Sequence, residues 1–500
     1  MIKTGRVVVL VLACAACSTH CNGPSDSAAV PSATPDASPS ADASSDATAP
    51  RSGTWGFDHA LSSAGANVEL NYNFGRSVAT DGASTVYAVW GDTQGGVSRV
   101  KLARSRDSGV TWEPEQTLSA DGVSAKHPTI AAVGAKVHVA WEQTIFGQMS
   151  VTTRRSDDRS ATWRAAVDLT KQVVVSSVTI AASGSRTRVV YTAGADAGAE
   201  VYTRGSSDDG ETWDAEQRIS EAQYASWVPT VELDGDRAYV AWVDYKDANE
   251  EEYFRASSDG GLHWGPVVRL TNDAADSWAG SLVVGKGSLH YAWFDRRAAG
   301  YLETDLESQL DQAAALVGAV VAPAPPRDPG TYYLDILGGR FYAKQAAIQA
   351  AAPGWIAGGG SAAQLQTLLD EFARRYEKWT NGWAIYTKRS DDGGATWTDD
   401  ARVDRCRRSP DAALARVLER RAAHGVVRRA GRRPAFQRVL QGLPRWWSDL
   451  GAGAAPHVGT DAEIDGSTRP SIAAADGTLH VVWSDGRGQS PAAFYERFGP

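Results

Sequence analysis

The sequence predicts an all-β fold, a six-bladed β-propeller with helical insertions on one face. Three observations lead to this prediction. One short motif recurs five times, a strand-like segment recurs six times, and the two ends of the chain look like the missing parts of a single blade. Alternation of apolar residues with a period of two is typical of strands, and a repeat of about 50 residues is typical of propeller blades.

The recurring motif has the form Ser-x-Asp-x-Gly-x-Thr-Trp. Its five copies are centred on Asp107, Asp158, Asp208, Asp259 and Asp392. The first four copies follow one another at intervals of about 50 residues. We expect each Asp and Ser side chain to bond the backbone of its own turn, while Gly supplies the positive φ. These five aspartates are therefore predicted to be structural.

Six strand-like segments alternate with the motif. They cover residues 86–90, 137–141, 188–191, 238–242, 289–293 and 479–483. A shorter apolar segment stands just before each of them. Each blade is therefore expected to run as an inner strand, a second strand, a third strand that ends in the motif, and an outer strand.

The two chain ends are expected to complete the sixth blade. Thr54-Trp55 and Leu61-Ser62 repeat the spacing found just after the first motif, so this segment looks like an outer strand without its blade. Residues 493–497 look like a third strand without an outer partner. Pairing of the two segments would complete blade six and remove a free sheet edge.

The motif resembles the Asp-box, or bacterial neuraminidase repeat (BNR), of sialidase-like propellers. The resemblance covers nearly all of the chain after residue 51, apart from two insertions. It implies an active site on the face that carries insertions. Family enzymes bind the substrate carboxylate with three arginines, use an Asp as acid/base, and use a Tyr nucleophile assisted by a Glu. A kelch-type propeller has a similar period, but the Asp-box sequence disfavours it.

Two insertions interrupt the repeat. The first, at about 299–380, joins the second and third strands of blade five, and we expect it to form a helical cap. Apolar residues recur there at helical spacing over 306–320 and again over 365–376, the latter after a capping residue at Ser361. The second insertion, at about 403–460, precedes the inner strand of blade six. In an up-and-down blade these two connections emerge on the same face.

The second insertion has an unusual composition. Residues 402–445 contain 13 Arg, no Lys and three acidic residues. A lid or an anion-binding segment would have this character. An out-of-frame stretch of a GC-rich gene would also read as Arg, Ala, Pro and Gly. Resequencing separates the alternatives, because an intact frame would exclude the second.

Candidate site residues lie where inner strands begin and second strands end. The catalytic candidates are Arg76, Asp92, Arg469 and Tyr245. The resemblance implies that the two arginines would bind substrate, that Asp92 would be the acid, and that Tyr245, or else Tyr495, would be the nucleophile. The candidates for substrate binding are Trp227, Trp278, Asp295, Arg296, Arg297, Asp485 and Arg487. Acids, arginines and Trp around a propeller mouth suit a polar or anionic sugar.

The catalytic set departs from the family pattern. The family's Phe-Arg-Ile-Pro reads Gly75-Arg76-Ser77-Val78 here, and no third arginine is assignable. Trp-x-Asp followed by Arg also occurs in non-catalytic Asp-box repeats. The sequence therefore favours a propeller that binds a glycan or a protein without the full catalytic set. The alternative is an exo-sialidase or related glycoside hydrolase that cleaves terminal sugars.

The N-terminus reads as an export signal. Lys3 and Arg6 precede a short apolar stretch, and Cys17 and Cys14 both stand in contexts that resemble the bacterial lipobox. We expect residues 1–17 to be a lipoprotein signal peptide, 18–50 a disordered tether and 51–500 the propeller. The protein would then be exported and lipid-anchored in the bacterial envelope, at the outer membrane or cell surface. An ordinary cleaved signal peptide is the alternative.

Charge and cysteine content limit the partners. The net charge is −9 and is spread along the chain, which disfavours a nucleic-acid partner. Only Cys406 lies beyond the N-terminal region, so no cysteine metal site or disulfide framework is expected. We expect no metal and no cofactor, and we expect a monomer that binds a glycan or surface protein and reaches a membrane through its lipid anchor.

Overall fold

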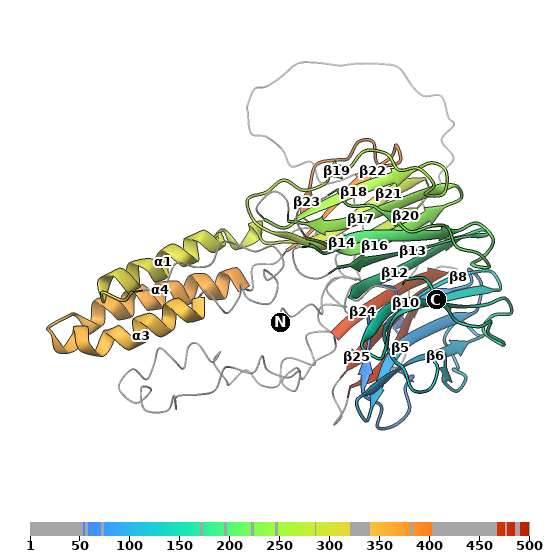
Figure 1. Cartoon of the computed structure of the whole chain (residues 1–500), viewed down its shortest axis with the longest axis horizontal. Helices are drawn as coiled ribbons and strands as arrows, with labels where there is room; N and C mark the ends of the chain where they lie inside the picture. Colours follow the sequence, from blue (N-terminus) through green and yellow to red (C-terminus); the bar gives the residue numbers. More distant parts are fainter. Residues whose placement is uncertain are drawn as a thin grey trace, which may run out of the picture.

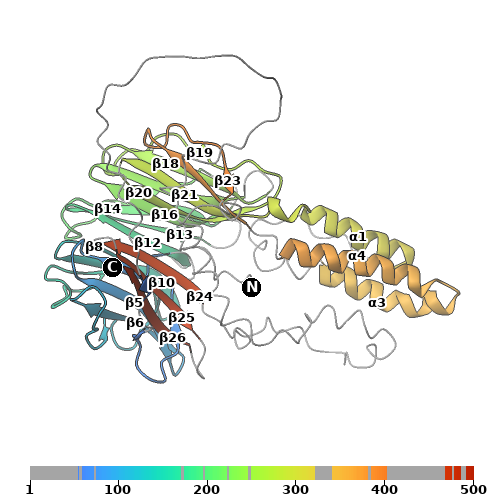
Figure 2. The same ribbon diagram turned by 180° about the vertical axis from the view of Figure 1, so that it is seen from behind.

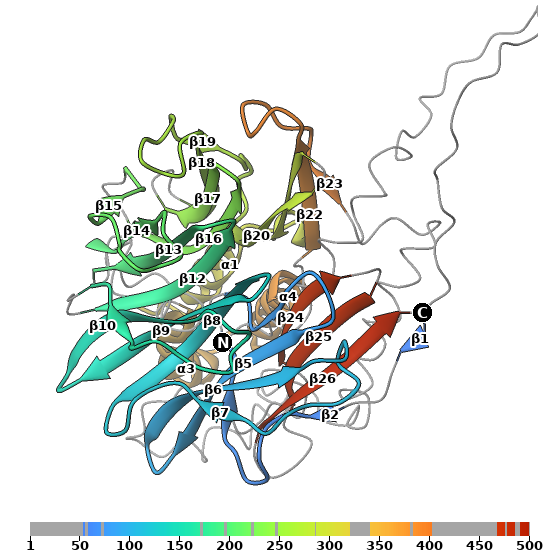
Figure 3. The same cartoon turned by 90° about the vertical axis from the view of Figure 1, so that its right-hand side faces the viewer.

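The computed structural model describes residues 54–55, 59–71, 75–170, 174–194, 198–221, 225–245, 249–285, 287–320, 341–380, 384–402, 468–475, 478–485 and 491–499. Six antiparallel sheets stand around a common axis as propeller blades (Figure 3). The predicted fold class is therefore confirmed.

The first three blades follow one another along the chain. In blade one, β3 (Val68–Glu69) and β4 (Val78–Thr80) pair with β5 (Val86–Gln94), which is followed by β6 (Val97–Ser105) and β7 (Gln116–Thr117). Blade two contains β8 (Ser124–Val133), β9 (Lys136–Ile145), β10 (Gln148–Ser156) and β11 (Val167–Asp168). Blade three contains β12 (Val175–Ser183), β13 (Arg186–Ala193), β14 (Glu200–Ser206) and β15 (Gln217–Arg218).

The last three blades include both chain ends. Blade four contains β16 (Ser226–Asp234), β17 (Arg237–Asp244), β18 (Glu251–Ser257) and β19 (Val268–Arg269). Blade five contains β20 (Ser277–Gly285), β21 (Ser288–Asp295), β22 (Ala384–Ser390) and β23 (Ala401–Arg402). Blade six contains β24 (Thr468–Ala475), β25 (Thr478–Asp485) and β26 (Ala492–Gly499), together with β1 (Thr54–Trp55) and β2 (His59–Ala60).

Large apolar side chains pack between neighbouring blades. Trp90, Trp141, Trp242 and Trp293 occupy the same position on four second strands and are fully buried. The core between blades one and two, for example, joins Val89 and Leu102 to Ile130 and Trp141. The aromatic and β-branched residues that predicted strands are thus the residues that hold each blade to the next.

The two chain ends pair in blade six as predicted. Strand β2 pairs with β26, with His59 opposite Tyr495, and β1 pairs with the end of β26. The Leu61 amide donates to the Ala493 carbonyl at 2.8 Å, which continues the pairing. The N-terminal segment is therefore the outer strand of the last blade, and the free edge of β26 is covered.

The five Asp boxes form almost identical turns. In the third copy, Asp208 Oδ1 accepts from Ser206 Oγ at 2.7 Å and from the Thr212 amide at 2.9 Å, while Oδ2 accepts from Thr212 Oγ1 at 2.6 Å. The Thr212 hydroxyl and the other donors lower the pKa of Asp208 to about 2. Gly210 has φ of +78°, as such a turn requires.

The first insertion forms a helical arm. After a short 3₁₀ turn, η4 (Arg297–Ala299), the arm contains α1 (Glu303–Leu316), α3 (Phe341–Ala357) and α4 (Ala362–Thr380), and the chain re-enters blade five at β22. Figures 1 and 2 show the arm projecting away from one face of the propeller. Its core contains Leu306, Leu310, Phe341, Leu365, Phe372 and Trp379.

Two of the three described arm helices, α1 and α4, follow the predicted pattern. The amide of Gln364 donates to Ser361 Oγ at 3.3 Å, so Ser361 caps α4 as expected. Helix α3 was not predicted, because it is rich in Ala on all sides and contains Pro353. None of the described helices is long and apolar enough to cross a membrane. The second insertion lies outside the described residues, as do the signal peptide and tether.

Candidate functional site

A ring of backbone bulges marks the face from which the arm projects. The inner strands of blades two to five share a register shift close to their first residues. At this shift one non-glycine residue has positive φ: His127 (50°), Ser177 (57°), Val228 (50°) and Ala279 (59°). Bulges redirect side chains, and they gather near functional sites. We call this face, with its inner-strand ends, the mouth.

Blades one and two meet at a buried histidine. His127 Nδ1 lies 2.8 Å from Glu142 Oε2, and its Nε2 lies 3.4 Å from Glu69 Oε1. Burial alone would lower the pKa of His127, but its bonds to Glu142 and Glu69 outweigh burial and raise it to about 9. The Ser177 amide of blade three donates to Glu142 Oε1 at 2.9 Å. His127 is therefore an imidazolium held between two carboxylates.

Asn71 ties the first three blades together at the same place. Its Nδ2 donates to the carbonyls of His127, at 2.9 Å, and Val178, at 3.2 Å. A Cβ at Gly75 would lie 2.3 Å from that nitrogen, so only glycine fits there. This glycine immediately precedes Arg76.

Arg76 forms an ion pair with Glu232, a residue of the inner strand of blade four. Blades one and four are three positions apart in the ring of six, so the pair links opposite inner strands. Glu232 is 7% exposed. In blades one, two, three and six an alanine occupies its position on the inner strand: Ala79, Ala131, Ala181 and Ala473. Glu232 is therefore an exception to the repeat that supplies a carboxylate to Arg76.

The remaining catalytic candidates lie on different strands. Asp92 is buried and accepts from the Asn67 amide at 2.9 Å and from Gln94 Nε2 at 3.0 Å. Tyr245 is 4% exposed at the end of β17. The backbone of Arg469 belongs to β24, which neighbours the segment just before β4 through a 2.9 Å bond from the Ser77 amide to Ser471 Oγ.

Asp295 and its neighbouring arginines attach the arm to blade five. Fully buried Asp295 accepts from Ser277 Oγ at 3.0 Å, from Trp293 Nε1 at 3.0 Å, and from the guanidinium of Arg297 at 2.6 Å. Arg297 also bonds Asp400 at 2.8 Å. The guanidinium of Arg296 lies 3.7 Å from the ring centre of Trp379 in α4. These candidates for ligand binding are thus engaged with protein groups.

The two candidate tryptophans belong to an apolar cluster between blades four and five. Trp278 is 5% exposed and packs with Val228, Val243 and Phe294, and Trp227 packs against the same cluster. The other two candidates cannot be placed as side chains. Asp485 ends β25, but its side chain is not described, and Arg487 lies outside the described residues.

A buried acid that sequence reasoning missed also lies between blades four and five. Glu252 Oε2 accepts from the Tyr291 hydroxyl at 2.5 Å, and neither side chain reaches solvent. Burial raises the pKa of Glu252 to about 8, with Glu251 and Asp295 adding to the effect. Valine stands at the corresponding position in blades one, two and three, at Val100, Val151 and Val201. This departure from the repeat is the feature of the sequence that could have revealed Glu252.

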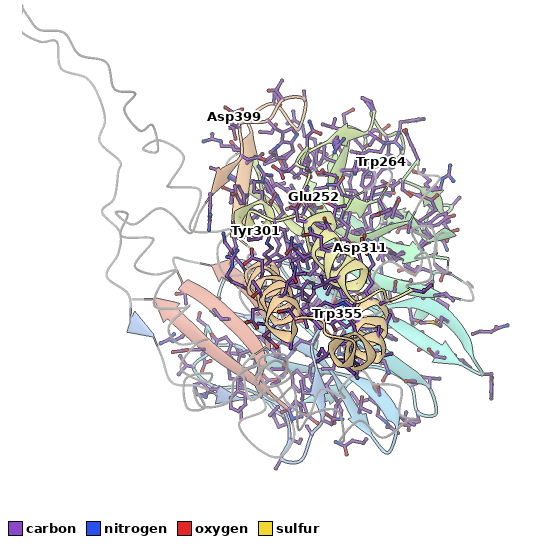
Figure 4. The ribbon with its side chains drawn as sticks, turned by 90° about the vertical axis from the view of Figure 1, so that its left-hand side faces the viewer. Glu252, Trp264, Tyr301, Asp311, Trp355 and Asp399 are labelled. Carbon is purple, nitrogen blue, oxygen red and sulfur yellow. The ribbon has the colours of Figure 1, made fainter. Side chains whose placement is uncertain are left out.

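Figure 4 views the mouth-bearing face, with the arm pointing toward the reader and Glu252 in the blades behind it. Among the described residues, no group of three or more His, Cys, Asp or Glu side chains is arranged to hold a metal ion.

Comparison with known proteins identifies the repeat. A family model described as "BNR repeat-like domain" matches residues 43–303. No curated protein shows significant sequence similarity to the chain.

Solved structures of sialidases and of an arabinofuranosidase are similar to this chain. A Trypanosoma rangeli sialidase in complex with sialic acid is 11% identical, with a TM-score of 0.40, over 89% of this chain and 58% of that one. A Hadza microbial sialidase is 14% identical, with a TM-score of 0.32, over 43% and 49%. The Fusarium graminearum GH93 α-L-arabinofuranosidase is 15% identical, with a TM-score of 0.35, over 47% and 83%. The chain thus spans about half the length of the sialidases.

Proposed function

The chain belongs to the family of BNR repeat-like domains, and on this premise we propose that it is an extracytoplasmic, sialidase-like propeller that binds a glycan or a protein at its mouth without a full catalytic set. The mouth is the natural place for a ligand. Bulged inner strands meet there, and the side chains differ from blade to blade.

The ion pair between Arg76 and Glu232 is the observation that carries the proposal. An arginine that binds the carboxylate of a substrate must be available to it, because a bidentate bond uses the guanidinium donors. Here the chain supplies its own carboxylate from the opposite inner strand. An anionic sugar would have to displace Glu232, whereas a neutral glycan or a protein surface would not.

A paired assay tests this function. We expect no turnover of a fluorogenic sialoside by the wild type or by Arg76→Ala. We expect the wild type to bind on a glycan array or to a surface protein, and Arg76→Ala to bind differently. Arg164→Ala is the matched control, because Arg164 is exposed, follows the second Asp box, and pairs with Asp157 at 2.9 Å. Sialoside turnover that disappears in Arg76→Ala alone would contradict the proposal.

An exo-sialidase or related glycoside hydrolase is the second candidate function. It is favoured by the neighbouring strands β4 and β24, which bring the backbones of Arg76 and Arg469 to the same end of adjacent inner strands. Under this alternative both arginines would bind the carboxylate of one substrate. Arg469→Ala and Arg76→Ala would therefore each raise the KM for a sialoside, and Glu232→Gln would lower it.

We also propose that the protein is exported and anchored by a lipid on Cys17 or Cys14. The support is the charged, apolar and lipobox-like order of the first residues. Labelling with a fatty acid in a bacterial host should tag the wild type, and Cys17→Ser or Cys14→Ser should abolish the label. An unlabelled wild type that is cleaved and released would instead indicate an ordinary signal peptide.

A further inference from the structure

Among the residues that the structure describes, the outer half of the arm has no charge. No charged residue lies between Lys344 and Asp370, a stretch that includes most of α3, the turn after it and the first turns of α4. The exposed positions among the described side chains of α3 are apolar or glycine, and its two glutamines, Gln345 and Gln349, are half-buried. The exposed residues are Ala346, Ala350, Pro353, Gly354, Ile356 and Ala357. A helix on a protein surface normally shows solvent a polar face, and a helix that is apolar all round is normally covered.

The charged residues of the arm lie elsewhere. Lys344 pairs with Asp311 of α1 at 2.6 Å, and Glu371 bonds both Arg374 and Arg375 in α4. Tyr301, at the start of the arm, lies beneath Lys378 at 5.0 Å. The arm is therefore charged toward the propeller and uncharged at the end that Figures 1 and 2 show farthest from it.

The uncharged end of the arm is a closely packed turn. The turn between α3 and α4 passes close to Trp355, where a Cβ at Gly360 would meet the indole at 2.3 Å. Gly359 has φ of +97°, a conformation that glycine accepts without strain. The side chain of Ile356 points outward and is 39% exposed. We call residues 346–360 the arm tip.

We propose that the arm tip contacts the interface of a lipid bilayer. A surface without charge offers nothing to an acidic or basic partner, whereas apolar and small side chains can enter the boundary between headgroups and acyl chains. The inference goes beyond the ligand of the mouth and does not depend on it.

The chain ahead of β1 is long enough for the proposed lipid anchor and the arm tip to reach one bilayer. The segment from Cys17 to Thr54 can bridge a long gap, at about 3.3 Å per extended residue. The arm is shorter than this, since the 19 residues of α4 span about 28 Å. A lipid on Cys17 and the arm tip could thus meet the same membrane, and two weak attachments on one molecule reinforce each other. The mouth would then face the bilayer.

Vesicle binding tests the proposal without the lipid anchor. The full chain carrying Cys14→Ser and Cys17→Ser is mixed with neutral phosphatidylcholine vesicles, and the bound fraction is measured by flotation. Adding Ile356→Glu should lower the partition coefficient roughly tenfold, because a carboxylate resists the bilayer interface. Val110→Glu is the matched control, since Val110 is 48% exposed in the first Asp box on the opposite face, and it should leave partitioning unchanged.

A second variant protects the test against misfolding. Ala350→Lys places a charge on the exposed side of α3 and should reduce partitioning as Ile356→Glu does, with unchanged circular dichroism. Equal partitioning of all variants, or no binding by the parent chain, would overturn the proposal. So would a lipid-free dimer that Ile356→Glu converts to a monomer, because that result would assign the surface to a second copy.

Discussion

The two faces of the propeller use charge in opposite ways. On the Asp-box face, five aspartates repeat one set of hydrogen bonds, and these bonds hold the pKa of Asp107, Asp158 and Asp208 near 2. On the mouth side, His127 and Glu252 are buried and have pKa values raised to about 9 and about 8. These aspartates are therefore ionised at neutral pH, whereas His127 and Glu252 have pKa values within about two units of neutrality.

Glu252 should give the largest pH effect. Its pKa in the folded chain, about 8, lies above the value of an unfolded chain, about 4.5. Between these values the folded state keeps a proton that the unfolded chain has lost, so the contribution of Glu252 to stability is complete below about pH 4.5. That contribution falls by roughly 1 kcal/mol per pH unit up to pH 8. Urea unfolding at pH 5, 6 and 7 should show this slope in the wild type.

Glu252→Gln keeps the shape and the bond to Tyr291 while removing the titration. The free energy of unfolding of Glu252→Gln should therefore lack the part of the pH dependence that Glu252 contributes in the wild type. The same slope in both chains would mean that Glu252 is already ionised at pH 5, and that the contrast between the faces is smaller than we infer.

His127 should give the next effect, at the opposite end of the pH range. Its folded pKa of about 9 exceeds the ordinary value of 6.5, so its contribution is complete below about pH 6.5 and is lost as pH rises through 9. The loss should be on the order of 2 kcal/mol. Nuclear magnetic resonance titration of the imidazole and unfolding at pH 7 and 9.5 would measure it. A midpoint below 7 would contradict this assignment.

Ser105 tests whether the stability of the Asp-box face is independent of pH. Ser105→Ala leaves the Gly109 amide without its 2.8 Å acceptor and removes the 2.7 Å bond to Asp107. We expect a loss of about 1 to 2 kcal/mol, equal at pH 5 and pH 9. Ser84→Ala is the control, because Ser84 is exposed in the turn between β4 and β5 and contacts the Asp-box turn only through its carbonyl, which accepts from the Ser108 amide at 2.7 Å. A loss that changes with pH would break the distinction between the faces.

Phe146 should give the smallest effect and the opposite sign. It is fully exposed in the hairpin between β9 and β10, with φ of +51°, where blade one has Gly95. A bulky residue is strained in this conformation, whereas Asn-Gly suits such a two-residue turn. Phe146→Asn should therefore raise the free energy of unfolding by about 0.5 kcal/mol. A loss of stability would mean that the ring has a packing partner.

The fold was predictable because its determinants are local and repeated. An Asp box bonds its own backbone, and a buried Trp marks each of four second strands, so both can be recognised without knowing the neighbouring blade. The same logic predicted that the N-terminal segment pairs with residues 493–497, and the structure has this pairing between β2 and β26. Helix α3 was not predicted, because its Ala-rich sequence shows no apolar stripe. The contacts of Phe341 and Ile348 also depend on α1 and α4, which are distant from them in sequence.

The site was predicted only in part, because its contacts join blades that are distant in sequence. Arg76 was identified, but no residue near it in the sequence indicates that Glu232 on the opposite inner strand is its partner. Trp278 was expected to bind a ligand at the mouth. Instead it packs against Phe294, next to the bulge at Ala279. Comparing the blades with one another, position by position, would have exposed Glu232 and Glu252 as exceptions.

The pairing in blade six also determines how the molecule would respond to force. Any pull on the N-terminus reaches the propeller through β1 and β2, which are two residues long each and bond only to β26 and its neighbours among the described strands. The bonds from Leu61 and to Ser62 would bear the load next. Force applied to the N-terminus of an anchored molecule should therefore unfold the last blade first and leave the strands of the other five blades intact.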